Sequence, residues 1–479
     1  MSSKILNALG RNSDELSTLV QNALTGGNGG ELYMTEVRSF SLSMSKGIIG
    51  TSTPAIIKGG SVRRINGIAT PFVTFDGFAD ASLIKALITI EKTPQDVATQ
   101  LHLKAAGQYG TQPYYTQDDV FEGAAFDVFH QQAITLLQEM NAYARRDARV
   151  ENVGISVSVA GKDILIARAD GKVLTDYRPT CQLSINVVLK DGSKKESSGE
   201  NFGLPMTISQ AFAVEATWQK MIDDSIRKAG NNLTAIEATA GNDFEVIFCP
   251  GFAGGVVLHE AFGHALEGDF HAKGNSAFQG KLGKRIAAKG VNVYEDGTVF
   301  SARGSYNFDD EGNPSNKNLL VDDGILVGLM TDEKSAAELG MALTGNGRRQ
   351  SYMHQPMPRM SNTYMAAGDS SVDNLISNVT KGYYVEELNG GQVDIVSSKF
   401  VQNGTQVRMI ENGKLGAYVK GVSFAGMGNE SYKHIIGIAN DFEISKNGSC
   451  GKDGQSVPVT AGQASMLFAK GALKVGGTA

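Results

Sequence analysis

Cysteine, tryptophan and proline are scarce in this chain of 479 residues, which contains 3 Cys, 1 Trp and 11 Pro. Three widely separated cysteines are too few for a disulfide framework, so we expect reduced thiols and a cytoplasmic protein. The first stretch, MSSKILNALGRNSDELSTLV, also lacks an apolar run followed by a small-residue cleavage site. The sequence therefore predicts no secretory signal.

Long apolar runs and an excess of positive charge are also missing. No segment reaches the roughly 18 apolar residues that a membrane-spanning helix needs. The 44 basic residues are outnumbered by 50 acidic residues, which gives a formal net charge of −6. Without a basic excess, the sequence predicts neither direct nucleic acid binding nor attachment to a membrane.

Glycine is abundant, with 57 residues, and many glycines follow Asn or Asp in NGG, DDG, ENGK and KDGQ. Such pairs favour tight turns between hairpin strands. Strand-like alternation covers residues 31–78 and 151–200, whereas helical periodicity covers 1–25, 81–105, 117–147 and 208–229. We predict an α+β fold. Residues 1–235 would form an N-terminal α/β domain of strand hairpins and helices, and residues 236–479 a mostly β domain with one metal-binding helix.

The metal-binding prediction starts from VLHEAFGHALEGDF, residues 257–270. On a helix with 100° per residue, one side of this stretch is an apolar stripe wide enough to pack on a core. The stripe contains Leu258, Ala261, Phe262, Ala265 and Leu266. The other side holds His259, Glu260, Gly263, His264 and Glu267. We expect the glycine to let a metal or a peptide backbone approach closely.

The two histidines are five residues apart, whereas zinc protease helices normally read H-E-x-x-H. On a regular helix, His259 and His264 would diverge by about 140°, too far to share one ion. A single π turn would align residues five apart, and such turns are frequent at functional sites. We therefore predict a metal site on a locally widened helix. The alternative is a solvated helix face with two surface histidines.

A catalytic zinc usually has three protein ligands and a water, so a third ligand is needed. The candidates are His271, His354, His434, Cys450 and Glu267. Cys450 stands in NGSCGKDGQSVPV, a glycine-flanked loop between two strand-like segments, with little apolar cover. Because cysteines are usually buried among apolar residues, a thiolate ligand is the more economical interpretation of this one. The other candidates stay open.

Several stretches resemble one known family. They are LHEAFGHALEGDF, GKLGKRIAAKGVNVYEDGT, RGSYNFDDEGNPSNKNLLVDDGIL, TGNGRRQSYMHQPMPRMSNTYM, GGQVDIVSSKFV, IENGK, CGKDGQSVPVTAGQASM and the terminal VGGTA. Together they cover nearly half the chain in collinear order. The first half matches more loosely, at TDYRP and GGSVRRINGIATPF. The chain thus resembles the metalloprotease branch of the TldD/PmbA family, first described as modulators of DNA gyrase.

The resemblance implies an α+β fold and zinc-dependent proteolysis of unfolded or peptide-like substrates in the cytoplasm, in peptide maturation or antitoxin degradation. It also implies a dimer, with a second copy or with a TldE/PmbA-like partner. The family motif places the Zn²⁺ ligands at His259, His264 and Cys450. It makes Glu260 the catalytic carboxylate, which passes a proton from water to the leaving amine.

Two segments are candidates for contacting the substrate. Arg349, His354, Arg359 and Tyr364, in RRQSYMHQPMPRMSNTY, are candidates for stabilising the oxyanion; the alternative is an ordinary charged surface loop. The strand-like GGQVDIVSSKFV, residues 390–401, is a candidate edge to which an extended peptide could add as a strand. Its alternative is a plain core hairpin.

Two other function classes stay open at this point. A non-catalytic regulatory subunit of a TldD/TldE-type complex would be expected to have a degraded metal motif, whereas all four motif residues are present here. A metal-dependent hydrolase of non-peptide amides would use the same chemistry as a peptidase. An assay that compares unfolded peptides with small amides as substrates would separate the peptidase from the amide hydrolase.

Overall fold

The computed structural model describes residues 4–50, 54–67, 69–93, 123–204 and 215–477. Strands predominate and form several sheets, with helices packed against them, which confirms the α+β class. Within the described ranges, no helix is both long and apolar enough to cross a membrane.

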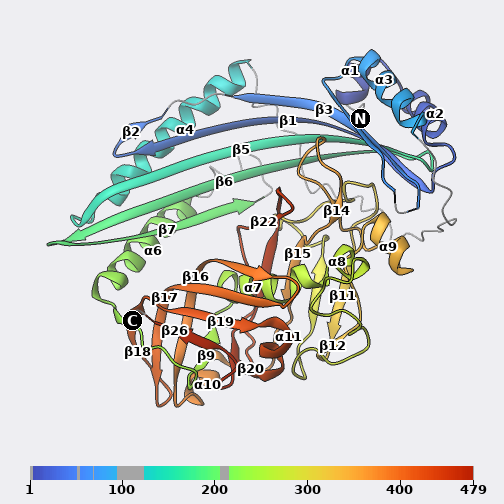
Figure 1. Ribbon diagram of the computed structural model, residues 1–479. Helices are drawn as coiled ribbons and strands as arrows, with labels where there is room; N and C mark the ends of the chain where they lie inside the picture. The colour runs from blue at the N-terminus through green and yellow to red at the C-terminus, as the bar shows by residue number, and fades with distance from the viewer. Residues whose placement is uncertain (1–3, 51–53, 68, 94–122, 205–214, 478–479) are drawn as a thin grey trace.

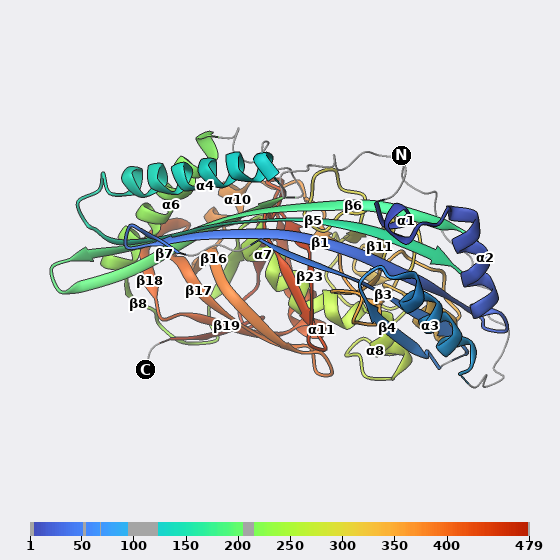
Figure 2. The ribbon, with the colours of Figure 1, turned by 90° about the horizontal axis from the view of Figure 1, so that it is seen from above.

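A long antiparallel sheet organises the N-terminal half, in the order β4-β3-β1-β5-β6-β7 with β2 paired to β1. Its strands are β1 (Gly29–Ser45), β2 (Ile48–Ile49), β3 (Ala55–Ile65), β4 (Phe72–Asp76), β5 (Val150–Arg168), β6 (Val173–Asp191) and β7 (Lys194–Leu204). Figure 1 shows β1, β5 and β6 crossing above the C-terminal half, and Figure 2 shows the same strands from above. The sheet therefore covers the C-terminal half, which contains the predicted metal-binding helix.

Helices pack on this sheet in two apolar clusters. They are α1 (Lys4–Leu9), α2 (Ser13–Leu24), α3 (Asp80–Glu91), α4 (Gly123–Ala144) and α6 (Glu215–Thr234). The single helix predicted over residues 1–25 is two helices, because Gly10 adopts a positive φ of 66° and Asn12 caps a new start. The predicted helices over 81–105 and 117–147 correspond to α3 and α4, but residues 94–122 lie outside the described ranges.

Two larger sheets form the C-terminal half. The nine-stranded sheet contains β8 (Ile236–Glu237), β9 (Glu245–Phe248), β16 (Lys381–Asp394), β17 (Lys399–Glu411), β18 (Lys414–Lys420), β19 (Ser423–Met427), β20 (Ile435–Ile438), β25 (Met466–Phe468) and β26 (Lys474–Gly476). The six-stranded sheet contains β10 (Val293–Asp296), β11 (Lys317–Asp322), β12 (Ile325–Leu326), β15 (Asn362–Met365), β21 (Glu443–Ile444) and β24 (Thr460–Gln463). The largest apolar core of the protein lies in this half.

Short elements complete the C-terminal half. The two-stranded pairs are β13 (Gly347–Arg348) with β14 (Met357–Pro358), and β22 (Ser449–Lys452) with β23 (Gln455–Pro458). The helical segments are α7 (Phe252–Leu258), η1 (His259–Gly263), η2 (His264–Leu266), α8 (Gly268–Ala272), α9 (Glu333–Leu339), α10 (Val372–Ser377), α11 (Gly428–Ser431) and η3 (Tyr432–His434). Of these, α7 and its continuation carry the predicted metal motif.

Three of the predicted glycine turns are confirmed. Asn412–Gly413, Asp453–Gly454 and Asp323–Gly324 each have two consecutive positive φ angles, as the tightest hairpin turns require. They join β17 to β18, β22 to β23 and β11 to β12. The NGG at 389–391 does not form such a turn. It lies inside β16, where the register with β17 shifts between Leu388 and Gly391.

Buried charges join the N-terminal sheet to the C-terminal half. Arg63 on β3 contacts Glu31 on β1 at 2.9 Å and Glu311 at 2.6 Å. Glu31 also pairs with Arg349. The side chains of all four are at most 1% exposed. Such a network fixes the two halves together only while each charge keeps its partner.

We predict that Arg63→Met destabilises the protein by roughly 3–5 kcal/mol, because it leaves the buried Glu311 without its cation and Glu31 with Arg349 alone. Urea unfolding can be followed by the fluorescence of Trp218, the single tryptophan, which is buried in the N-terminal core. The matched control is Arg146→Met, because Arg146 pairs with Asp223 on the surface, where both side chains are more than half exposed. Equal unfolding midpoints for the two variants would contradict this prediction.

Candidate metal centre

The helix with the two histidines changes its winding between them. The α-helix α7 ends at Leu258, a π turn covers His259–Gly263, and a 3₁₀ turn covers His264–Leu266. The amide of His264 donates to the carbonyl of His259, five residues earlier. The two imidazole centres consequently lie 5.0 Å apart. The widened helix predicted from the five-residue spacing is confirmed.

Close packing holds this helix between β16 of the larger sheet and β24 of the smaller one. A side chain at Gly254 would collide with Gln463 on β24, so glycine is needed for the approach. Gly263 has a similar role, because a Cβ there would collide with Met360. The sequence had suggested that this glycine faces a metal or a peptide, but the structure places Met360 against it instead. The predicted apolar stripe is buried, as expected: Leu258, Ala261, Phe262, Ala265 and Leu266.

Cys450 completes a cluster with the two histidines. It lies on the hairpin strand β22, and its Sγ is 3.4 Å from Nε2 of His264. One ligand atom from each of His259, His264 and Cys450 lies within 4.8 Å of the others, and all three residues are buried. Zinc bound tetrahedrally to His and Cys separates its ligand atoms by about 3.5 Å. The donor set and the 3.4 Å between Cys450 and His264 therefore fit a zinc ion.

Burial and mutual charge act against each other within the cluster. Burial disfavours the charged form of His264, but Glu267 and the Cys450 thiolate outweigh it and raise the pKa of His264 well above its ordinary value. Burial likewise opposes a thiolate at Cys450, yet the two imidazoles lower the pKa of Cys450 well below its usual range. The lowered pKa of Cys450 favours the deprotonated sulfur that a metal ligand requires, whereas the raised pKa of His264 means that a metal ion must displace a proton from that imidazole.

Outer carboxylates and a lysine support the cluster. Glu267 Oε2 lies 3.1 Å from Nδ1 of His264 and 3.0 Å from Nζ of Lys452. Although burial opposes its charge, Lys452 and His264 lower the pKa of Glu267 to about 2. The charged carboxylate can accept the Nδ1 proton of His264, while Nε2 of the same ring faces Cys450. Lys452 also contacts Asp269 at 2.7 Å.

Sequence reasoning named Glu267 as a possible ligand and did not single out Lys452 or Asp269. The signal for Lys452 was its position two residues after Cys450. Alternate residues of a strand share one face, so β22 directs both side chains to the same side.

A cavity of about 750 Å³ opens beside the three candidate ligands, and Glu260 is part of its wall. Burial raises the pKa of the Glu260 carboxyl, whereas His259 and His264 oppose that shift. The other wall residues come mainly from α7, from β16, from residues 445–448 and from the β22 hairpin, and include Gln392, Val393 and Asp453. The cavity thus brings a carboxylate and the candidate metal ligands to one space that a substrate can enter.

The remaining candidate ligands lie elsewhere. His271 is buried, and its Nε2 lies 2.9 Å from the carbonyl oxygen of Ala265. Burial lowers the pKa of His271. His434 is exposed at the end of a 3₁₀ turn. Neither belongs to the group of side chains that could hold one ion.

None of the four substrate-contact candidates lines this cavity. Arg349 belongs to the buried network between the two halves. Arg359 is buried and donates to the carbonyl oxygen of Cys450, so it supports the β22 hairpin from behind. The Nδ1 of His354 contacts the hydroxyl of Ser351 at 2.8 Å, and the hydroxyl of Tyr364 donates to Asp296 at 3.3 Å. These side chains do not reach the cavity because most of this segment pairs with distant residues of the interior.

Fold and site together define a class of protein. A buried His-His-Cys cluster beside a glutamate, open to a cavity, fits a metal-dependent hydrolase. Residues 124–233 match the model of the PmbA/TldA metallopeptidase central domain, and residues 241–474 match that of the C-terminal domain. The chain belongs to this family, as its sequence motifs predicted.

Relatives extend the match to nearly the whole chain. The Metalloprotease TldD homolog of Haemophilus influenzae is 37% identical over 94% of this chain and 92% of its own length. The Metalloprotease TldD homolog of Buchnera aphidicola subsp. Acyrthosiphon pisum is 36% identical, with the same coverage. The crystal structure of TldE from Thermococcus kodakarensis is similar in fold, with a TM-score of 0.73 and 17% identity over 96% of this chain and 99% of that one.

A second solved structure supports the same fold. A protein of Thermotoga maritima described as a putative modulator of a DNA gyrase has a TM-score of 0.74 and 16% identity. The match covers 96% of this chain and 100% of that protein.

Proposed function

We propose that this protein is a zinc-dependent peptidase of the cytoplasm that hydrolyses unfolded or extended peptides. His259, His264 and Cys450 would hold the zinc, and Glu260 would be the general base. The convergence of the three ligand atoms within 4.8 Å carries the proposal, because it occurs at the wall of a cavity that Glu260 also lines. The intact motif argues against a purely regulatory subunit.

When bound, a zinc ion lowers the pKa of a water molecule and polarises a peptide carbonyl. Glu260 would accept the proton of the attacking water and later deliver it to the leaving amine. Glu267 would hold His264 in the tautomer whose Nε2 faces the ion, and Lys452 would keep Glu267 charged. Arg359 would hold the main chain of Cys450 in place through its carbonyl.

The free edge of β16 supports binding of an extended peptide. Along the nine-stranded sheet, β16 pairs with β17 on one side, but β9 covers only Gly382–Val385 on the other. Among the described residues, no second strand pairs with residues 386–394. Part of this edge, Gln392 and Val393, lines the metal cavity. A peptide that adds here would be held mainly by its main chain, so binding would tolerate many sequences.

Metal analysis combined with a peptidase assay tests the proposal. The purified protein should contain about one zinc per chain and should cleave unfolded peptides until a chelator removes the metal. Cleavage of small amides without cleavage of peptides would instead favour an amide hydrolase. A zinc-loaded protein that cleaves neither would contradict the proposed activity.

We also predict that the active form is a dimer, with a second copy or with a TldE/PmbA-like chain. A protease of low selectivity in the cytosol needs a shielded site, and a partner would supply the shield. Sedimentation velocity at micromolar concentration measures the state. A monomer with full peptidase activity would rule out this requirement.

A further inference from the structure

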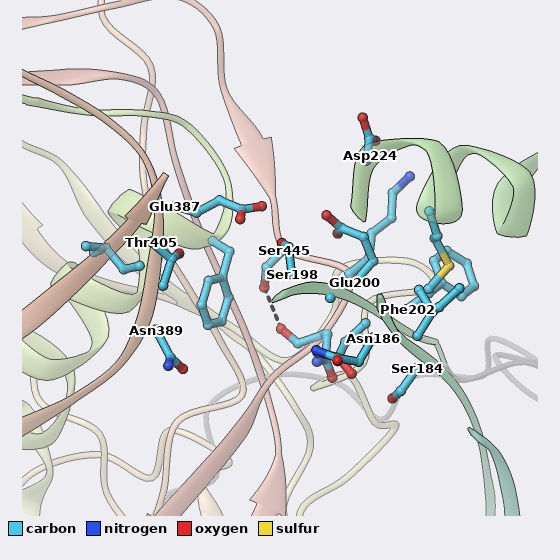
Figure 3. A pocket seen from close by; sticks show the side chains of 18 of the residues that line it. Ser184, Asn186, Ser198, Glu200, Phe202, Asp224, Glu387, Asn389, Thr405 and Ser445 are labelled. Carbon is cyan, nitrogen blue, oxygen red and sulfur yellow. Dashed lines mark hydrogen bonds between the residues drawn. The ribbon is translucent and has the colours of Figure 1, made fainter. Parts of the chain in front are cut away.

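A second, larger cavity lies between the two halves of the protein. Its volume is about 1210 Å³, and its walls come from the N-terminal sheet, from α6, from β16 and from the start of α7. Figure 3 shows how side chains from these separate elements surround it: Glu200 and Ser198 from β7, Asp224 from α6, and Glu387 and Asn389 from β16. None of the family-motif residues lines this space.

The two cavities are neighbours. Phe252, Ser445 and Asn447 line both of them. Phe252 begins α7, and His259 directly follows its end, so the two residues lie about 10 Å apart along the helix. An extended peptide covers that length with roughly three residues. The unpaired edge of β16 follows the same path, because Glu386–Asn389 line the second cavity and Gln392–Val393 the first.

The second cavity is acidic. Six carboxylates line it against three lysines: Glu196, Glu200, Asp224, Glu386, Glu387 and Glu443 against Lys220, Lys420 and Lys446. Some of these charges are already matched, since Asp224 pairs with both Lys220 and Arg227, and Glu196 pairs with Lys420. The negative charges of the other carboxylates are not fully compensated by cations.

Glu200 and Glu387 face each other across the junction of the two halves and share one ammonium, that of Lys228. Two carboxylates on one lysine leave one negative charge in excess. The carboxylate of Glu386 accepts a hydrogen bond from the hydroxyl of Tyr418 at 3.2 Å. Among the described residues, neither Glu386 nor Glu443 forms an ion pair with a cation. Even with Lys446 of the same wall and the second cation on Asp224 counted against these carboxylates, a net negative charge borders the space next to the metal cavity.

We propose that this second cavity binds a positively charged segment of the peptide substrate, beginning about three residues from the scissile bond. The inference rests on the proposed peptidase function and names the substrate class: extended peptides rich in lysine or arginine on one side of the cleaved bond. Uncharged polar side chains, among them Ser184, Asn186 and Thr405, offer hydrogen bonds that any main chain can use. The cavity therefore selects among peptide segments by their charge.

Matched peptides test the charge preference. In an unstructured peptide whose cleavage site has been mapped, three consecutive residues, starting three positions from the bond, are made all lysine, all glutamine or all glutamate. The change is made on each side of the bond separately. On one side, kcat/KM should fall in that order, by roughly tenfold from lysine to glutamate. The ratio should shrink at about 1 M salt, where the screening length is about 3 Å.

A charge-neutralising variant ties the preference to this cavity. Glu386→Gln with Glu443→Gln keeps size and hydrogen bonding while it removes two carboxylates from the wall. The lysine-to-glutamate ratio of kcat/KM should fall to about threefold or less. The control is Glu139→Gln with Glu411→Gln, which removes the same net charge from exposed positions that line neither cavity. This control should keep the tenfold ratio.

Binding separates the two proposals. The affinities of the lysine and glutamate peptides for the Glu260→Gln protein can be compared by fluorescence anisotropy without turnover. Tighter binding of the lysine peptide that is lost in the Glu386/Glu443 variant supports the acidic subsite, even if no peptide is cleaved. A lack of cleavage would overturn only the proposed peptidase activity. Equal binding and equal cleavage of the three peptides would overturn the subsite and leave the peptidase standing.

Discussion

Replacing Glu260 by glutamine should abolish peptide hydrolysis while the protein keeps its zinc. Glutamine has nearly the same shape as glutamate but cannot accept the proton of water. General base catalysis contributes about 10²- to 10⁴-fold, so kcat should fall by at least about 10²-fold. The three proposed ligands are untouched by the change, and Glu260 forms part of the cavity wall beside them. Zinc content and kcat measured on the same preparation give the result.

The matched control for this variant is Asp453→Asn. Asp453 lines the same cavity, is exposed, and has a positive φ of 47° that asparagine adopts readily. It removes one negative charge from the cavity without touching the proposed base, so it should change kcat only slightly. If the Glu260→Gln protein binds zinc and still turns over at more than a few per cent of the wild-type rate, another group is the base.

Local spacing predicted the parts of the site that depend on neighbours along the chain. Five residues between His259 and His264 require a wider turn if both are to face one ion, and the π turn provides it. Asn-Gly and Asp-Gly pairs predicted three tight turns because backbone angles there depend on two residues alone. The NGG at 389–391 behaves differently, because pairing of β16 with β17 makes it a bulge within a strand.

The features of the site that could not be predicted from the sequence depend on pairing between residues far apart in the chain. Arg349 was a candidate for the oxyanion, but it pairs with Glu31, which is 318 residues earlier in the chain. Arg359 contacts the main chain of Cys450, 91 residues later. Nothing in the spacing of RRQSYMHQPMPR indicates such partners. The acidic cavity is hidden for the same reason, because its carboxylates come from β7, α6, β16 and β21 and meet only in the folded protein.

The third proposed ligand, Cys450, gives the other large expected effect. Cys450→Ser should weaken zinc binding by more than the roughly 10- to 100-fold that loss of an outer partner costs, because a hydroxyl is a poor substitute for a thiolate on zinc. Peptidase activity should fall with the bound zinc. The fold should survive, since the surrounding core is large and apolar. Cys181→Ser is the matched control, because Cys181 lies in β6 of the N-terminal sheet, and it should keep its zinc.

Alkylation provides an independent measurement on the unmodified protein. Zinc should shield the sulfur of Cys450, which lines the cavity, and chelation should expose it to the reagent. Cys181 and Cys249 should react slowly in both samples, since both are buried and burial raises the pKa of each thiol, to about 12 for Cys181. Mass spectrometry of the labelled peptides reads all three sites at once. Equal labelling of Cys450 with and without chelator, together with normal zinc in the serine variant, would remove Cys450 from the ligand set and leave the two histidines with a different third partner.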